Sequence, residues 1–175
     1  GCIQLGLGVG FEATLPNRIP KVSIIVPCKD INSYVQECIH TCVALDCPSS
    51  EILLLPDSPP PSEFRGVKTI PTGPLRPGAK RNIGAKHAVG EFYAFIDSDA
   101  YPSRDWLRNS LRYFNDPDVA GVGGASITPE GDSLMQKGSG AVYSSMIGGF
   151  KFAFRYSSKQ LQETDDLPSC NLIVR

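Results

Sequence analysis

The 175-residue sequence lacks an excess of charge of either sign. It has 17 lysines and arginines against 18 aspartates and glutamates, so its formal net charge at pH 7 is -1. Proteins that bind nucleic acids through the phosphate backbone usually carry a basic excess or a basic face. We therefore expect no nucleic-acid partner for this chain.

Long apolar runs are also missing. No segment reaches the roughly 18 uninterrupted apolar residues of a membrane-spanning helix. The apolar stretch at 2–11 is short, is interrupted by Gln4 and several glycines, and follows no basic region, so we do not expect it to be a secretory signal. With 41% hydrophobic and 20% charged residues, the composition is that of an ordinary globular protein, and the length fits one domain with a sizeable core.

The six cysteines show no CxxC spacing, and the chain is longer than the usual disulfide-rich module. We expect free thiols and a cytoplasmic setting. For a longer protein that contains this chain, a position at the inner face of a membrane stays open. A metal cluster of Cys38, His40, Cys42 and Cys47 is the alternative. Cys38 and Cys42 lie four residues apart on a predicted helix, but His40 falls off their face, so small buried helix residues are favoured.

Apolar runs that end at proline or glycine alternate with segments at helical spacing. Asn32 or Ser33 is predicted to cap a first helix, Gly90 to end a second, and Ser103 to cap a third. The predicted strands are 21–27, 51–55, 67–70, 92–96 and 119–122, the predicted helices are 32–45, 77–88 and 103–114, and 138–154 and 172–174 are assigned as a helix and a strand.

This alternation predicts an α/β fold with a mostly parallel sheet and helices on both faces. In such sheets, ligands bind beyond the carboxyl ends of the strands, where the strand order reverses. Polar segments follow three of the predicted strands: PCKD at 27–30, PDS at 56–58 and DSD at 97–99. We expect them to meet at one edge of the sheet, which is therefore the predicted site.

The two aspartates of the DSD segment, Asp97 and Asp99, are the strongest candidates for chemistry. On an extended chain they point to the same side, where two carboxylates repel each other unless a cation lies beside them. Carboxylate oxygens suit Mg²⁺ or Mn²⁺, which complete their shells with water and substrate phosphates. The alternative is that Asp97 closes a turn and Asp99 begins the next loop.

The helix that begins at Pro77 places two cations near the same edge. Lys80 and Arg81 lie close to its amino terminus, where backbone amides and the helix dipole favour a phosphate. This arrangement predicts a diphosphate site. A solvent-exposed helix face explains the two residues equally well, so both interpretations stay open.

Three segments, taken in order, resemble the family 2 glycosyltransferases of GT-A fold. They are VSIIVPCKD at 22–30, EILLLPDS at 51–58 and GAKRNIGAKHAVGEFYAFIDSDAYPSRDWL at 78–107, and the later DLPSCNLIVR at 166–175 also resembles a segment of that family. The resemblance implies a Rossmann-like, mostly parallel sheet. It also implies a nucleotide-sugar-binding domain at 21–175, preceded by an N-terminal extension at 1–20.

The resemblance also implies roles for individual residues. Asp57 would hydrogen-bond the base or ribose, while Pro56 stands where the family usually has another aspartate, so UDP and GDP both stay open as the nucleotide. Asp97 and Asp99 match the motif that holds Mn²⁺ or Mg²⁺. The implied donor-binding residues are Pro27, Lys29, Asp57, Lys80, Arg81, Asn82, Asp97 and Ser98, and the implied metal ligands are Asp99 and Asp97.

The implied activity is metal-assisted, inverting transfer of a sugar from a UDP- or GDP-sugar to a sugar, lipid or protein acceptor. Inversion requires a base that deprotonates the acceptor hydroxyl. In the family this base follows the segment that 166–175 resembles, so we expect it beyond Arg175. We expect this chain to be the donor-binding portion of a longer protein, whose membrane association stays open, and we treat Asp165 and Asp166 as loop residues.

Two other classes of function are alternatives to this activity. A nucleotidyltransferase would carry a glycine-rich loop with arginine and lysine directly after the first strand, and PCKDINSY lacks one. A nucleotide-binding module without catalysis fits a missing base. An acidic motif in the downstream reading frame would favour the enzyme over the module.

Overall fold

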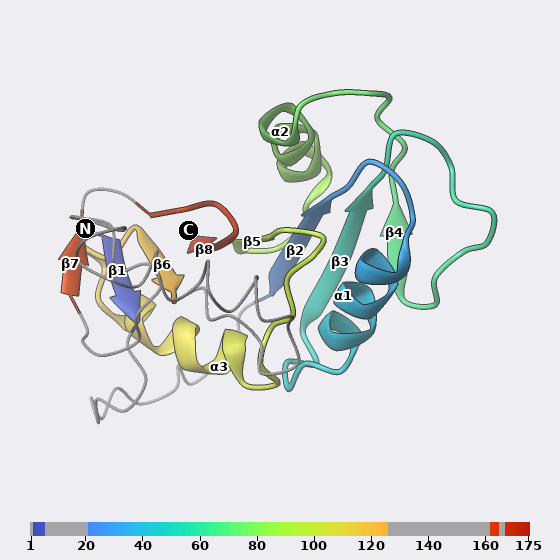
Figure 1. The fold of residues 1–175 in the computed structure, drawn as a ribbon. Helices are drawn as coiled ribbons and strands as arrows, with labels where there is room; N and C mark the ends of the chain where they lie inside the picture. The colour runs from blue at the N-terminus through green and yellow to red at the C-terminus, as the bar shows by residue number, and fades with distance from the viewer. Residues whose placement is uncertain (1, 6–20, 126–161, 165–166) are drawn as a thin grey trace, which may run out of the picture.

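The computed structural model describes residues 2–5, 21–125, 162–164 and 167–175. In this part of the chain, eight strands form one sheet in the order β4-β3-β2-β5-β8-β6-β1-β7 (Figure 1). The helix predicted at 138–154 lies outside the described residues. The strands are β1 (Cys2–Leu5), β2 (Val22–Pro27), β3 (Ser50–Leu55), β4 (Val67–Thr69), β5 (Phe92–Ile96), β6 (Gly121–Gly124), β7 (Gln162–Thr164) and β8 (Asn171–Val174).

Strand β2 lies between β3 and β5 and runs parallel to both. All six of its residues are buried, as expected for a β-branched run in a parallel strand covered on both faces. From β2 the sheet grows outward through β3 and β4 on one side, and β5 lies on the other side. The strand order therefore reverses between β2 and β5, which is where a ligand site is expected.

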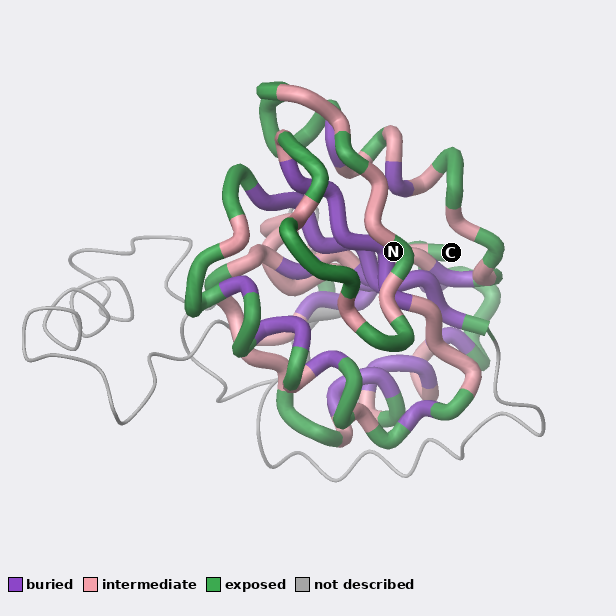
Figure 2. Tube along the Cα trace, turned by 90° about the vertical axis from the view of Figure 1, so that its right-hand side faces the viewer, coloured by how far each residue is buried: buried purple, intermediate pink, exposed green. Residues whose placement is uncertain are grey.

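The helices cover both faces of the sheet, as predicted. Helices α1 (Ser33–Val43) and α3 (Trp106–Leu111) pack on one face, and α2 (Pro77–His87) packs on the other (Figure 1). Asn32 caps α1, because its Oδ1 accepts a hydrogen bond from the Val35 amide at 3.0 Å. Buried residues follow the strands and the inner sides of these helices, and exposed residues lie on the outer loops (Figure 2).

The ends of two helices differ from the sequence prediction. Gly90 does not terminate α2 in a left-handed conformation; a Cβ there would lie 2.6 Å from the Ser23 backbone nitrogen, so glycine is required for the close approach to β2. Helix α3 begins only at Trp106, whose amide donates to the Ser103 carbonyl at 2.9 Å. The Ser103 hydroxyl bonds the Asp105 carboxylate instead of capping the helix.

The second half of the sheet contains the larger differences. Strand β6 starts at Gly121 instead of Val119, because the Val119 amide is still bonded to the Asp116 carbonyl in the preceding turn. The predicted strand at 172–174 is confirmed as β8, which runs antiparallel between β5 and β6. Residues 2–5, assigned above to an extension, pair with β6 as strand β1 of the same sheet.

The structure also shows the state of the cysteines and the position of the single tryptophan. Five cysteines of the described residues have free thiols: Cys28, Cys38, Cys42, Cys47 and Cys170. None of the helices in the described part of the chain is long and apolar enough to cross a membrane. Trp106 is 8% exposed and belongs to the core, where its Nε1 donates to Asn171 Oδ1 at 2.8 Å. This bond ties α3 to the start of β8.

Candidate functional site

A pocket of about 800 Å³ lies beyond the carboxyl ends of β2, β3 and β5, next to the start of α2. The three polar segments predicted to meet at this edge do meet there. Of the predicted site residues, only Asn82 is not among those that line the pocket; it is exposed on α2. The lining residues that the sequence had identified are Pro27, Lys29, Asp57, Lys80, Arg81, Asp97, Ser98 and Asp99.

Lys80 forms the floor of this pocket. Its side chain is only 3% exposed, and its ammonium donates to the Cys28 carbonyl at 2.7 Å, to the Leu55 carbonyl at 3.2 Å and to the Asp57 carboxylate. An ammonium has three N–H groups, and these acceptors use all of them. Lys80 thus connects the carboxyl ends of β2 and β3 to Asp57. Its position near the start of the helix had predicted contact with a diphosphate instead.

The main chain of Asp57 is fixed as firmly as its side chain. Its amide donates to the Lys29 carbonyl at 3.0 Å, and its carbonyl accepts from the Gly73 amide at 3.0 Å. The neighbouring residue is Pro56, at the position where the family usually has an aspartate. It offers only its carbonyl, which accepts hydrogen bonds from the Thr72 amide at 2.9 Å and the Thr72 hydroxyl at 3.2 Å. This edge of the pocket therefore has one carboxylate, that of Asp57.

Arg81 and Asp97 form the second ion pair of the site. Arg81 Nη2 donates to Asp97 Oδ1 at 2.5 Å, with the side chains 15% and 41% exposed. The Arg81 Nε is buried and has no hydrogen-bond partner in the described part of the chain. A buried N–H without a partner is unusual in a folded protein, and a ligand acceptor in the pocket would satisfy it.

The DSD segment is a turn rather than the end of a strand. Strand β5 ends at Ile96, and the Ala100 amide donates to the Asp97 carbonyl at 3.0 Å. The same carbonyl accepts a weak bond from Cys38 Sγ at 3.6 Å, which links the turn to α1. The expectation of an extended chain at 97–99 is therefore wrong, but both carboxylates line the pocket: Asp97 is paired with Arg81, while Asp99 is exposed.

Among the described residues, the set of side chains able to bind a metal ion is incomplete. The described residues contain no group of three or more histidine, cysteine or acidic side chains able to hold a metal. Asp99 and the second oxygen of Asp97 offer hard oxygen ligands at the mouth of the pocket, which suits Mg²⁺ or Mn²⁺ that takes its remaining ligands from water and a diphosphate. The proposed cysteine cluster is excluded on α1, because Cys38 and Cys42 are buried and His40 is exposed.

Six of the lining residues were not among the predicted site residues. Tyr34 and Leu75 are 54% and 44% exposed and give the rim an apolar surface. Tyr34 follows the cap of α1 by two residues, which is the signal that could have placed it at this edge. Burial raises the pKa of the Cys28 thiol to about 11, so it is no nucleophile at neutral pH. The other three are Asn32, Pro74 and Pro77, and the two prolines lie on either side of Leu75.

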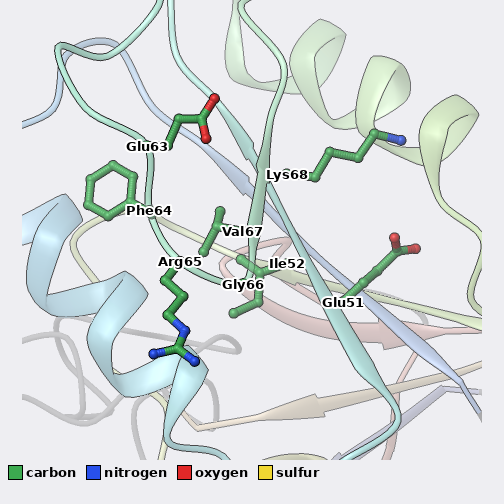
Figure 3. Close-up of a pocket in the computed structure, with 8 residues that line it drawn as sticks. All are labelled: Glu51, Ile52, Glu63, Phe64, Arg65, Gly66, Val67 and Lys68. Carbon is green, nitrogen blue, oxygen red and sulfur yellow. The ribbon is translucent and has the colours of Figure 1, made fainter.

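A second hollow of about 600 Å³ lies at the opposite ends of β3 and β4. Its walls come from the first residues of these strands and from the loop before β4. Figure 3 shows that Glu63 and Arg65 point in opposite directions and that Lys68 extends away from Phe64. Because its charged groups do not converge on one point, this hollow offers no arrangement for chemistry.

Known proteins resemble this chain along much of its length. The sequence model described as glycosyl transferase family 2 matches residues 23–174. Poly(ribitol-phosphate) beta-N-acetylglucosaminyltransferase TarS of Staphylococcus aureus is 27% identical over 109 residues, which are 55% of this chain and 19% of TarS. A dolichyl N-acetyl-alpha-D-glucosaminyl phosphate 3-beta-D-2,3-diacetamido-2,3-dideoxy-beta-D-glucuronosyltransferase of Methanococcus voltae is 24% identical over 147 residues, 73% of this chain and 46% of that protein. The chain thus spans less than half the length of either relative.

Solved structures share the fold. Mannosyltransferase PcManGT from Pyrobaculum calidifontis, in complex with GDP-Man and Mn²⁺, aligns with a TM-score of 0.55 at 21% identity over 79% of this chain and 44% of that chain. S. aureus TarS 1-349 in complex with UDP-GlcNAc aligns with a TM-score of 0.53 at 23% identity over 65% and 36%. The predicted GT-A fold is confirmed by these alignments. Since the family match covers residues 23–174 of the 175, the chain belongs to glycosyl transferase family 2.

Proposed function

We propose that this chain is the donor-binding part of a glycosyltransferase that moves a sugar from a UDP- or GDP-sugar to a sugar, lipid or protein acceptor. The observation that carries the proposal is the convergence of Asp57, Arg81 and Asp99, from three separate segments, on one pocket at the reversal of strand order. The relatives that bear glycosyltransferase names, and the structural neighbours in complex with GDP-Man or UDP-GlcNAc, support it.

The charged side chains of the pocket form two groups, those held in ion pairs and those exposed at the mouth. Asp57 and Asp97 are each paired with a buried or half-buried cation, which leaves Lys29 and Asp99 at the mouth. The Lys29 side chain is 83% exposed, and its ion pair within the described residues is with the exposed Asp30 at 3.9 Å, a contact of little energy. We assign Lys29 to the diphosphate, because a long exposed lysine can move to a phosphate without breaking a buried bond.

Arg81 would serve the same anion from the pocket wall. Its Nη2 is held by Asp97, so the guanidinium is fixed in orientation and its unpartnered Nε–H remains to donate to a ligand oxygen. Asp57 would accept a hydrogen bond from an N–H of the base or an O–H of the ribose. Tyr34 and Leu75 on the rim would exclude water from the bound nucleotide.

Asp99, with Asp97, would hold Mn²⁺ or Mg²⁺ together with the donor's diphosphate. The bound ion would supply Lewis-acid stabilisation of the negative charge that develops on the leaving phosphate. The carboxylates alone repel a diphosphate, so their presence beside Arg81 and Lys29 favours a cation between them and the ligand. The Mn²⁺ complex of PcManGT supports this assignment.

For an inverting reaction a base must also deprotonate the acceptor hydroxyl. The three carboxylates of the pocket already have other assignments: Asp57 and Asp97 in ion pairs, and Asp99 to the metal ion. We therefore propose that the base comes from a part of the protein outside the described residues. Asp165 and Asp166 also lie outside them. A cytoplasmic setting remains a proposal that rests on the cysteine pattern of the sequence.

Calorimetric titration with UDP and with GDP, each with and without Mn²⁺, tests the proposal. We expect one of the nucleotides to bind, and Mn²⁺ to strengthen its binding by at least about tenfold in the unaltered chain but not in Asp99→Ala. Asp118→Ala, an exposed aspartate far from the pocket in sequence, is the matched control and should keep the Mn²⁺ effect. Binding that is indifferent to Mn²⁺, or an Mn²⁺ effect that survives in Asp99→Ala, would remove the metal assignment. Absence of binding by both nucleotides would overturn the proposed function.

A further inference from the structure

Lys80 is the only lysine that is buried among the described residues, with 2% of its surface exposed. A buried ammonium is tolerated only when acceptors surround it. Here the carbonyl of Cys28, directly after β2, the carbonyl of Leu55, the last residue of β3, and the Asp57 carboxylate supply one acceptor for each of its three N–H groups. Lys80 thus connects the ends of two strands to a carboxylate of the pocket.

The approach of α2 to the sheet makes this burial possible. Gly84 lies one turn after Lys80 on the same side of α2, and it is buried. A Cβ at Gly84 would lie only 2.6 Å from Ile25 Cγ2, so the helix is in close contact with β2 at this point. The glycine lets the helix lie close to the strands, and the lysine side chain reaches their carboxyl ends.

We propose that Lys80 is a positioning residue that acts on the nucleotide through Asp57 and does not contact the diphosphate. The proposal rests on the proposed function and goes beyond it by assigning a distinct role to one cation. Asp57 is held at its amide, at its carbonyl and, by Lys80, at its carboxylate. A carboxylate with one oxygen engaged keeps acceptor sites on the other, so it can take an N–H or O–H of a nucleoside in a fixed orientation.

The alternative is that Lys80 turns outward and binds the diphosphate. That movement would leave the Cys28 carbonyl and the half-buried Asp57 carboxylate without the cation that now pairs with them. Leaving one member of such a buried pair uncompensated is strongly unfavourable. Lys29 and Arg81 stand at the same pocket and can meet a phosphate without breaking any bond to Lys80.

The test compares a nucleoside diphosphate with its nucleoside: UDP with uridine, or GDP with guanosine, whichever diphosphate the unaltered chain binds. Lys80→Met removes the ammonium and keeps a similar side-chain length. We expect it to weaken the diphosphate and the nucleoside by the same factor, about tenfold or more. A loss confined to the diphosphate, or no loss for either ligand, would overturn the proposal. Lys86→Met, which changes an exposed lysine of the same helix, is the control and should leave both affinities unchanged.

General damage to the pocket would also weaken both ligands, so a double-mutant cycle separates it from an effect through Asp57. In the Asp57→Asn background we expect Lys80→Met to weaken UDP or GDP by less than about twofold, because the group through which it acts is already altered. A further loss of about tenfold would overturn the proposal. Removing both charges together avoids an unpaired buried charge, so this comparison remains decisive even when Lys80→Met alone does not fold.

A spectroscopic measurement completes the experiment. The ¹³C signal of the Asp57 carboxyl group, assigned by its disappearance in Asp57→Asn, should move in Lys80→Met and stay in place in Lys86→Met. An unmoved signal in Lys80→Met would show that the carboxylate does not depend on Lys80 and would overturn the proposal. If the unaltered chain binds neither UDP nor GDP, the proposed function fails and this proposal fails with it. Binding by the unaltered chain without the expected variant effects refutes the role of Lys80 alone.

Discussion

Replacing Gly84 by alanine tests how closely α2 must lie against the sheet. The new Cβ would lie 2.6 Å from Ile25 Cγ2 and 3.2 Å from Leu55 Cδ1, both on fully buried side chains. Ile25 is β-branched and stiff, so it cannot turn away easily. Overpacking of this kind destabilises by about 1 to 3 kcal/mol, which opposes a gain of about 1 kcal/mol from the better helix propensity of alanine.

Gly78→Ala supplies the matched control, because it makes the same change in the same helix where nothing lies within 4 Å of the added Cβ. The propensity gain should therefore appear without the clash, and the two variants should differ by about 1 to 3 kcal/mol. For a domain of this size that difference corresponds to a melting temperature about 2 to 12 °C lower for Gly84→Ala.

Thermal unfolding followed by circular dichroism measures this difference directly. The clash should also shrink in an Ile25→Ala background, since both nearest contact atoms of that side chain are then missing. Because Lys80 lies one turn away on the same side of α2, an outward shift of the helix should weaken nucleotide binding as well. Equal melting temperatures for Gly84→Ala and Gly78→Ala would refute the argument.

Three further predictions concern the free energy of unfolding and its dependence on pH. The hydrogen bond from Ser103 lowers the pKa of Asp105 from its ordinary 3.8, so Asp105→Asn should reduce the free energy of unfolding at neutral pH, and its deficit should vanish in urea titrations as the pH falls through the lowered pKa. Trp106→Phe removes the donor to Asn171 and should reduce the free energy of unfolding by about 1 to 2 kcal/mol; an unchanged urea midpoint would contradict this. Burial raises the pKa of Cys28 from 9.0 to about 11, so the folded chain should lose stability as the pH rises above 9, and Cys28→Ala should lose less over that interval.

Much of the fold was predictable because the local signals agree with the tertiary structure. The apolar run of β2 is buried along its whole length, Asn32 caps α1 through its side chain, and Pro77 begins α2, as the residue types favour. The errors fall where a long-range contact decides the local conformation. Gly90 is a glycine because Ser23 of β2 approaches it, and no pattern within its own segment contains that information.

In the candidate site, too, the features set by strand direction were predictable and those set by long-range packing were not. The sheet-edge rule brought Asp57 and Asp97 together correctly, because it depends only on strand direction and order, and Arg81 meets them from the start of α2. The partners of the cations could not be derived in this way. Whether Lys80 meets a phosphate or the protein's own carbonyls depends on how deeply α2 is seated, and that depth is set by packing at Gly84.

The position of β8 bears on the order in which the chain can fold. This strand comes from the end of the described sequence, yet it lies in the middle of the sheet and joins the β4-β3-β2-β5 half to the β6-β1-β7 half. During synthesis the strands beside the candidate site, which belong to the first half, can form early, but the two halves acquire their shared strand only when residues 171–174 leave the ribosome. Such long-range pairing folds slowly and exposes unpaired strand edges until it is complete. Until β8 pairs, the edges of β5 and β6 therefore stay open to other strands, and the four residues that close them lie far in sequence from the residues proposed to bind the nucleotide.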